Sequence, residues 1–248
     1  MNDDMFKEKI LKARQSAVSK AGSDWENYVE NFLKESLRGI KAESNEQTAF
    51  IDDIEIQRMG KKQEINNLKK NYPKLYKSLF IPIVNFAKDR ERLLKNMEII
   101  DDVFTTGVMG DTDIVVFSRN YQVPLVIVSC KVSLHGRLTE TLFYSLYYRI
   151  TNKIKFTLAT PDKGKQAEDK WETEWGTPQN PSKDRMLASL FLDGVYVDNV
   201  PVFMPNGFNT NTDKTAVGGI VRELSELPFD ILRWYEDIKF IINNRRED

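Results

Sequence analysis

The segment that most constrains the fold is residues 123–131, VPLVIVSCK, an apolar run that ends in a lysine. Side chains alternate along a strand, and both faces of this one are apolar before Lys131. Its two faces are Val123, Leu125, Ile127, Ser129 and Lys131, and Pro124, Val126, Val128 and Cys130. A strand that is apolar on both faces lies in the middle of a sheet that is covered on both sides. The sequence therefore predicts an α/β protein with this segment as a central strand.

Lys131, at the carboxyl end of this strand, needs a negatively charged partner. Removing an ammonium from water is costly unless a counter-charge or a ligand receives it. No acidic residue precedes Lys131 within the strand. The partner must therefore come from another part of the chain or from a substrate.

The segments around the central strand predict the order strand, strand, helix, strand. Residues 113–118 (DIVVFS) form the first strand, and a turn at residues 119–122 joins it to the central strand as a hairpin. Residues 139–154 have the pattern of a helix packed on the sheet, and residues 155–160 (KFTLAT) that of the next strand. This order places helices on at least one face of the sheet.

The rest of the chain is predicted to add helices to a single domain of residues 1–248. An apolar stripe over residues 23–38 predicts an amphipathic helix that Gly39 ends. Charged residues from about 60 to 97 indicate a helical insertion, and the polar residues 161–184 a long excursion from the sheet.

Beyond the excursion, two apolar stretches are predicted. Residues 186–204 are predicted to return to strands, with a tight turn near residues 193–194. Residues 219–248 are predicted to form terminal helices that are broken near Pro228.

Composition excludes several classes of protein and site. The 248 residues include 36 basic and 37 acidic ones, so the net charge of −1 does not indicate a nucleic-acid partner. One Cys and one His exclude an intramolecular disulfide and argue against zinc, so any metal would be held by oxygen. No signal-peptide core and no run of about 18 apolar residues occurs, so we expect no membrane partner and a cytoplasmic location.

Asp113 and Lys131 form the candidate chemical pair, because adjacent strands can bring them to one edge of the sheet. A carboxylate can hold a hard divalent cation through oxygen. A lysine beside it can orient the attacking water and stabilise the charge that develops on a phosphoryl group. Such a pair suits phosphodiester hydrolysis.

The text GDTDIVVF followed by VIVSCKVSL resembles the nuclease core of the PD-(D/E)XK superfamily, and its Ser-Cys-Lys form is similar to a subset of type II restriction endonucleases. The segment KAGSDWENYVENFLKESL resembles the amino-terminal helix of such nucleases. The resemblance implies a mixed β-sheet flanked by helices, Mg²⁺ as cofactor, double-stranded DNA as substrate and a homodimer. It also implies that Asp113 binds the metal and that Lys131 is the catalytic lysine.

Two positions depart from the motif. Thr112 stands where the motif has proline, and Ser129 stands where it has a second acid. Glu140 and Glu26 are the candidates for the missing catalytic and metal-binding carboxylate. Related enzymes draw this acid from the helix that follows the lysine, about four residues beyond Glu140, where this chain has Tyr144.

Several residues have both a functional and a structural interpretation. Glu26 matches the amino-terminal helix motif, but Ser23 and Glu26 also have the spacing of a helix capping box. Asp111 is interpreted as a turn or cap residue, with a second metal contact as the alternative. Cys130 is expected to be a small buried group.

The segment after the lysine contains the candidate DNA-binding residues. The resemblance to Ser-Cys-Lys enzymes implies that Ser133, His135 and Arg137 contact DNA, and an arginine can bind guanine or a phosphate. The predicted function is a type II restriction endonuclease. The alternatives are a repair or junction nuclease of the same superfamily, and an inactive sequence-specific DNA-binding protein.

Overall fold

A mixed six-stranded sheet forms the centre of the computed structural model, which describes residues 3–43, 49–82, 107–134, 137–152, 154–167, 170–198 and 216–244. Its strands, in spatial order, are β1 (Ile54–Arg58), β4 (Ile114–Ser118), β5 (Val123–Cys130), β6 (Lys155–Thr160), β9 (Gly194–Val197) and β10 (Val221–Glu223). The pairs β1–β4 and β4–β5 are antiparallel, whereas β5, β6, β9 and β10 run parallel. The predicted α/β fold with a mixed sheet flanked by helices is confirmed.

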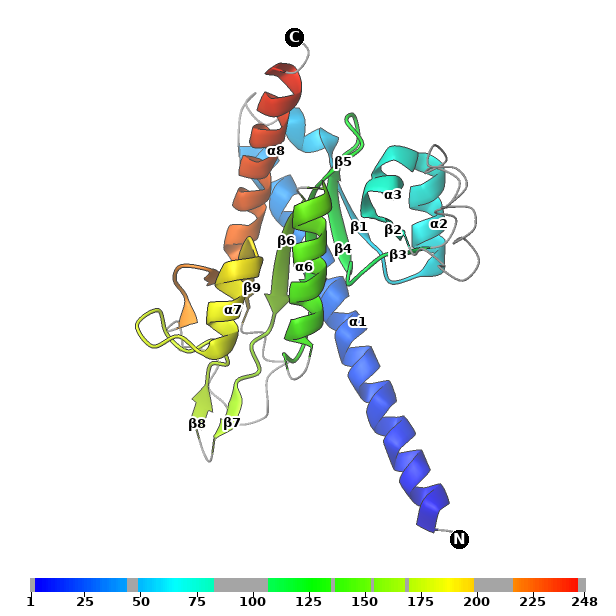
Figure 1. The fold of residues 1–248 in the computed structure, drawn as a ribbon, viewed down its shortest axis with the longest axis vertical. Coiled ribbons are helices and arrows are strands. Elements are labelled where there is room, and N and C mark those ends of the chain that lie inside the picture. The colour runs from blue at the N-terminus through cyan, green and yellow to red at the C-terminus, as the bar shows by residue number, and fades with distance from the viewer. Residues whose placement is uncertain are drawn as a thin grey trace, which may run out of the picture.

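Helices cover both faces of the sheet (Figure 1). One face is covered by α6 (Leu138–Asn152), α7 (Lys183–Phe191), α2 (Lys62–Asn71) and α3 (Pro73–Leu79), and the other by α1 (Asp3–Glu43) and α8 (Leu227–Asn244). Two apolar cores result, one on each side of the sheet. The central strands β4 and β5 supply both cores because their side chains alternate, as the apolar pattern of β5 predicts.

The remaining elements are short. They are the pair β2 (Ile81–Pro82) and β3 (Gly107–Val108), the pair β7 (Lys165–Ala167) and β8 (Lys170–Glu172), and the 3₁₀ helices η1 (Ala49–Asp53) and η4 (Leu224–Glu226). The β7–β8 hairpin lies in the predicted excursion. Helices α2 and α3 lie in the predicted insertion, of which residues 83–97 fall outside the described residues. The extent of the single domain stays a prediction.

Helix α1 packs on the sheet through an apolar stripe repeated every three to four residues. Trp25, Val29, Leu33 and Leu37 are buried along it. The sequence predicts that the helix ends at Gly39, but the helix continues to Glu43. Gly39 meets no neighbouring atom within 4 Å of an added Cβ, so it is neither a cap nor a close-packing position.

The predicted face of the central strand is wrong at one position. Leu125 contacts the same core as its neighbour Val126, whereas it was expected beside Ile127. The register of β4 and β5 shifts between Val116 and Phe117, so a β-bulge reverses the alternation there. Ile127, Ser129 and Lys131 keep the predicted order beyond the bulge.

Two other element predictions are wrong in part. The apolar residues 186–191 belong to helix α7 and not to a strand, because Arg185, Ala188 and Leu192 face the core at helical spacing. Strand β10 precedes the terminal helix, and Pro228 is the second residue of α8, where proline needs no amide partner. In the described parts of the chain, no helix is both long and apolar enough to span a membrane.

Candidate active site

The partner of Lys131 comes from the loop before β4. Its ammonium donates to Asp111 Oδ1 and to Asp113 Oδ2, the latter at 3.1 Å. Only 2% of the Lys131 side chain is exposed. Two carboxylates therefore compensate one buried ammonium at the carboxyl end of the central strand, which explains why a lysine can end this strand.

Asp113 is held by the hairpin that the sequence predicts. Its Oδ2 accepts a hydrogen bond from the Cys130 amide at 2.6 Å, and its carbonyl accepts one from the Met59 amide at 2.9 Å. The adjacent, antiparallel strands β4 and β5 thus bring residues 113 and 131 together. Cys130 itself is buried in the opposite core, as expected.

Asp111 lies deeper in the same site. Its side chain is 5% exposed, and its Oδ2 accepts hydrogen bonds from Ser129 Oγ at 2.8 Å and from Thr141 Oγ1 at 2.6 Å. Its φ is +34°, a left-handed conformation that aspartate adopts more readily than most residues. Ser129, which replaces the motif's second acid, therefore contacts an acid that comes from the loop.

Contacts with α6 fix this loop. Tyr148 Oη accepts a hydrogen bond from the Gly110 amide at 3.3 Å. Thr112 Oγ1 donates a hydrogen bond to the Gly110 carbonyl at 2.6 Å. The Tyr144 ring lies against Gly110 so closely that a Cβ there would be 2.0 Å from Tyr144 Cδ1. Thr112 thus has a structural role at the position of the motif's proline.

Glu26 reaches the site from α1. Burial, followed by the charge of Asp113, raises the pKa of the Glu26 carboxyl. Gly60, after β1, lies beside Glu26 Oε2, which would be 3.4 Å from an added Cβ. Trp25 Nε1 ties α1 to the sheet by donating to the Ala159 carbonyl at 3.0 Å.

The capping-box interpretation of Glu26 is wrong. Ser23 lies inside α1, which begins at Asp3, so no helix terminus is present at Ser23. The Glu26 carboxylate is therefore available for the site.

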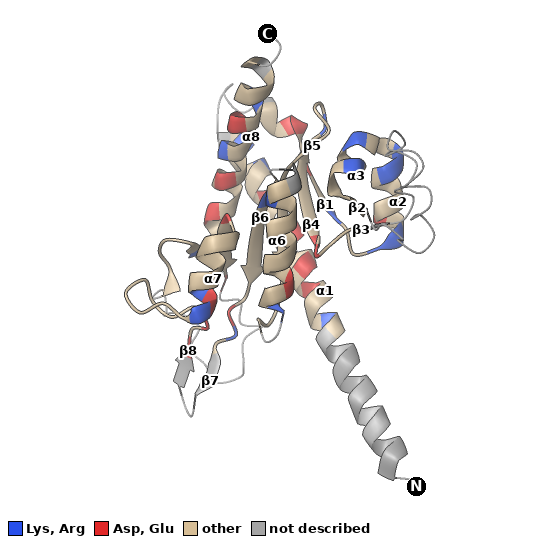
Figure 2. Ribbon diagram, in the orientation of Figure 1, with Lys and Arg blue, Asp and Glu red and all other residues tan. Residues whose placement is uncertain are grey.

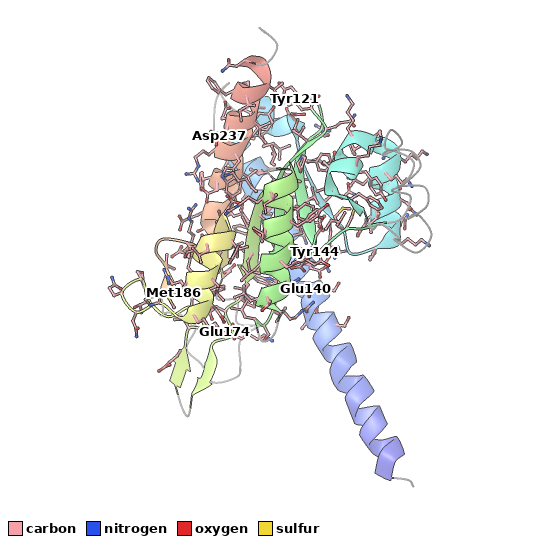
Figure 3. The ribbon with its side chains drawn as sticks, viewed as in Figure 1. Tyr121, Glu140, Tyr144, Glu174, Met186 and Asp237 are labelled. Carbon is pink, nitrogen blue, oxygen red and sulfur yellow. The ribbon has the colours of Figure 1, made fainter. Side chains whose placement is uncertain are left out.

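Glu140 lies in the first turn of α6 and is exposed. Figure 3 shows Glu140 and Tyr144 one turn apart on the side of α6 that faces the loop before β4. Acidic positions of α1, α6 and this loop gather at one end of the sheet (Figure 2). The structure thus places Glu140 at the rim of the site, next to Thr141, which contacts Asp111.

The predicted DNA-binding residues follow Lys131 at the same edge. Ser133 and Arg137 are exposed, and the Arg137 amide donates to the Leu134 carbonyl at 3.0 Å. His135 lies outside the described residues.

The charges of Lys131 and of the aspartates beside it affect one another's pKa values. Burial works to lower the pKa of Lys131, but the charges of Asp113 and Asp111 outweigh it and raise the pKa overall. Burial raises the pKa of Asp113, and the Lys131 charge offsets part of that rise. The lysine is therefore a stable ammonium, and the acids gain from any further cation.

Few side chains of the described residues could hold a metal ion at this site. In the described ranges, no group of three or more His, Cys, Asp or Glu side chains is placed to hold an ion. Mg²⁺ commonly takes one or two carboxylates and completes its shell with water and substrate phosphates. Asp113, which is 21% exposed, and the half-buried Glu26 are the acids of this region that could supply such carboxylates.

Asp111 is the site residue that the sequence interpretation undervalued. It was interpreted as a turn or cap residue. The backbone of Asp111 has a φ of +34°, so the alternation of an extended chain does not place its side chain. The sequence pattern therefore gave no signal for its contact with Lys131.

Comparisons with known proteins place this geometry in a family. No curated protein matches the chain in sequence. The solved structure "Crystal structure of specific restriction endonuclease AgeI-DNA complex" is similar, with 16% identity, a TM-score of 0.34 and coverage of 64% of this chain and 62% of that chain. A family model described as BsaWI restriction endonuclease type 2 matches residues 84–214, just over half of the chain. The chain therefore belongs to the BsaWI family of type 2 restriction endonucleases.

Proposed function

We propose that this protein is a type II restriction endonuclease of the PD-(D/E)XK superfamily that hydrolyses double-stranded DNA at a specific sequence with Mg²⁺. The observation that carries the proposal is the buried Lys131 ammonium, held by two aspartates at the carboxyl end of the central strand. Family membership supports the activity.

Asp113 and Glu26 are the residues that would hold Mg²⁺. When bound, the ion would polarise the scissile phosphate and lower the pKa of a water molecule. Lys131 would bind a non-bridging phosphate oxygen and stabilise the charge that develops on it. Because Lys131 is already held in place, this stabilisation needs little rearrangement during the reaction.

Glu140 remains the alternative second acid. Its support is its place at the rim of the site, in the first turn of α6. Glu26 has the stronger support, because Asp113 and Lys131 both act on the pKa of its carboxyl. Substitution of each residue by Gln would distinguish them, and both carboxylates could contribute to metal binding.

Sequence recognition is assigned to the segment after Lys131. In sequence, residues 133–137 follow Lys131 and precede α6, so a duplex positioned at Lys131 would pass close to Ser133 and Arg137. The exposed side chains of Ser133 and Arg137 support this role.

A homodimer is the assembly that fits one active site per chain, because cutting both strands of a duplex requires two sites. Both sites must face the same duplex. Helix α6, which connects the parallel strands β5 and β6, is the surface that we propose for the dimer. It exposes an apolar stripe at Phe143, Leu146 and Ile150, which a second copy of α6 would bury.

The function is tested by incubating the protein with long DNA of known sequence and Mg²⁺ and sequencing the ends. Discrete fragments that share one palindromic sequence are expected. Smears or structure-selective nicks would instead indicate a repair or junction nuclease. Specific binding without cleavage in Mg²⁺ or Mn²⁺ would indicate an inactive DNA-binding protein.

A further inference from the structure

Asp111 and Asp113 contact the same ammonium, but they differ in how many of their carboxylate oxygens already accept hydrogen bonds. Asp111 Oδ1 accepts from Lys131, and Asp111 Oδ2 accepts from Ser129 and Thr141. Both oxygens are therefore engaged, and the side chain is 5% exposed. Three hydrogen-bond donors and its burial therefore leave this carboxylate less able to bind a metal ion than an exposed one.

Asp113 has the opposite character. Its side-chain hydrogen bonds within the described residues both end on Oδ2, from Cys130 and Lys131. Its side chain is 21% exposed. Oδ1 is thus the oxygen that can face a cation and water.

We propose that Asp111 is a positioning residue that holds the Lys131 ammonium in place and so leaves Asp113 free to hold the metal ion. The inference rests on the proposed function. If Asp113 turns toward a cation, Lys131 would otherwise be a buried ammonium without a counter-charge. Asp111 supplies that charge throughout the reaction.

This role also accounts for Ser129. In this chain, position 129 supplies a hydroxyl donor, and Thr141 supplies a second one from α6. Together they orient Asp111, whose backbone is held at a φ of +34°. An acid from the loop thus takes the space next to position 129, and Ser129 is its hydrogen-bond partner.

The first test is Asp111→Asn, measured by single-turnover cleavage over a range of DNA concentrations. We expect the rate constant to fall about a hundredfold and the half-saturating DNA concentration to change less than about threefold, because the variant misplaces a transition-state contact. Mn²⁺ affinity, followed by the electron paramagnetic resonance of free Mn²⁺, should stay near the wild-type value. Asp113→Asn should reduce it.

The second test transfers the carboxylate from position 111 of the loop to position 129 of strand β5. Ser129 Oγ lies 2.8 Å from Asp111 Oδ2, so an aspartate at position 129 would reach the same space. The double substitution Asp111→Ser with Ser129→Asp should cut at least about tenfold faster than Asp111→Ser alone. A structural role that depended only on the loop would not be rescued in this way.

A third measurement is independent of cleavage. Acylation of Lys131 by a succinimidyl ester, followed by mass spectrometry, should be at least about tenfold faster in Asp111→Asn than in the wild type, because Lys131 loses one of its two carboxylate partners. Asp53→Asn is the matched control. Asp53 is also a buried aspartate that accepts from a serine hydroxyl, that of Ser118, but lies at the other end of β4.

The outcomes separate this inference from the proposed function. A wild-type protein that never cuts DNA would refute the function, and unchanged Lys131 acylation in Asp111→Asn would refute the positioning role. Wild-type cleavage rates in Asp111→Asn would also refute it. Equal slowing by Asp53→Asn would show that any buried aspartate has the same effect, and would overturn the assignment.

Discussion

The ring of Tyr144 fills the space that a side chain at position 110 would need: a Cβ on Gly110 would be 2.0 Å from Tyr144 Cδ1 and 2.1 Å from Cε1. Gly110 directly precedes Asp111. The helix that follows the catalytic strand therefore sets the path of the loop that supplies the acids.

Gly110→Ala should disturb both stability and cleavage. The added methyl must displace Tyr144 or the loop, and overpacking of this kind typically costs about 1–3 kcal/mol. Thermal unfolding and the cleavage rate measure the two effects. Gly39→Ala is the control, because it lies inside α1 with nothing within 4 Å and should stabilise by about 1 kcal/mol. Unchanged cleavage in Gly110→Ala would argue against control of the loop by Tyr144.

Asp113→Asn should abolish cleavage and leave the fold and DNA binding largely intact, because the site loses a metal ligand. Lys131→Ala should abolish cleavage too, but it also leaves two buried carboxylates unpaired, a loss that typically costs about 3–5 kcal/mol. Cleavage assays, DNA binding in Ca²⁺ and thermal unfolding separate the two cases. Cleavage by either variant within about tenfold of wild type would refute the assignment.

Glu26→Gln should raise the melting temperature of the metal-free protein at pH 8. Burial and Asp113 raise the pKa of Glu26 above its unfolded value, so its ionised form destabilises the fold above the folded pKa. This cost disappears as the pH falls through the folded pKa towards the unfolded value near 4.3. Thermal unfolding in EDTA from pH 4 to pH 8 should show the advantage of Glu26→Gln shrinking with falling pH. A gain that is constant with pH would contradict a charge effect.

Cleavage across Mg²⁺ concentrations separates Glu26 from Glu140. We expect Glu26→Gln to slow cleavage at least about a hundredfold and to shift its Mg²⁺ dependence to higher concentrations, because a metal ligand is lost. Glu140→Gln is the matched control on α6 and should have the smaller effect. The reverse order of effects would assign the second acid to Glu140. Wild-type rates in both variants would mean that neither residue binds the metal.

Ile150→Glu should convert the proposed dimer to a monomer. Ile150 is 71% exposed on α6, and a carboxylate there would be buried against a second copy of the helix without a partner. Sedimentation with cognate DNA measures the mass, and the variant should lose double-strand cleavage. Phe240→Glu on α8 is the control, because Phe240 is 68% exposed on the other side of the sheet. A dimeric Ile150→Glu variant would exclude this surface.

The sequence predicted the parts of the site that depend on local pattern. Alternation within residues 113–118 and 123–131 and the short turn between them suffice to bring Asp113 and Lys131 together. The role of Asp111 could not be predicted in this way. It depends on a left-handed backbone and on hydroxyls from β5 and α6, which come together only in the folded chain.

Two element predictions failed for a related reason. Apolar residues of α7 alternate well enough to suit a strand, and only the core that they contact decides for a helix. Ser23 has a capping spacing, but a spacing does not reveal that the helix has already begun twenty residues earlier. Register, caps and helix starts are decided by contacts distant in sequence.

The hydrogen bond from Trp25 to the Ala159 carbonyl spans 134 positions of the chain. Long-range contacts of this kind form late in folding, because the entropy of closing so large a loop must be overcome first. During synthesis, Trp25 and Glu26 emerge from the ribosome well before Ala159, the partner of this hydrogen bond in β6. The bond that ties α1, which carries Glu26, to β6 can therefore form only after β6 has been made.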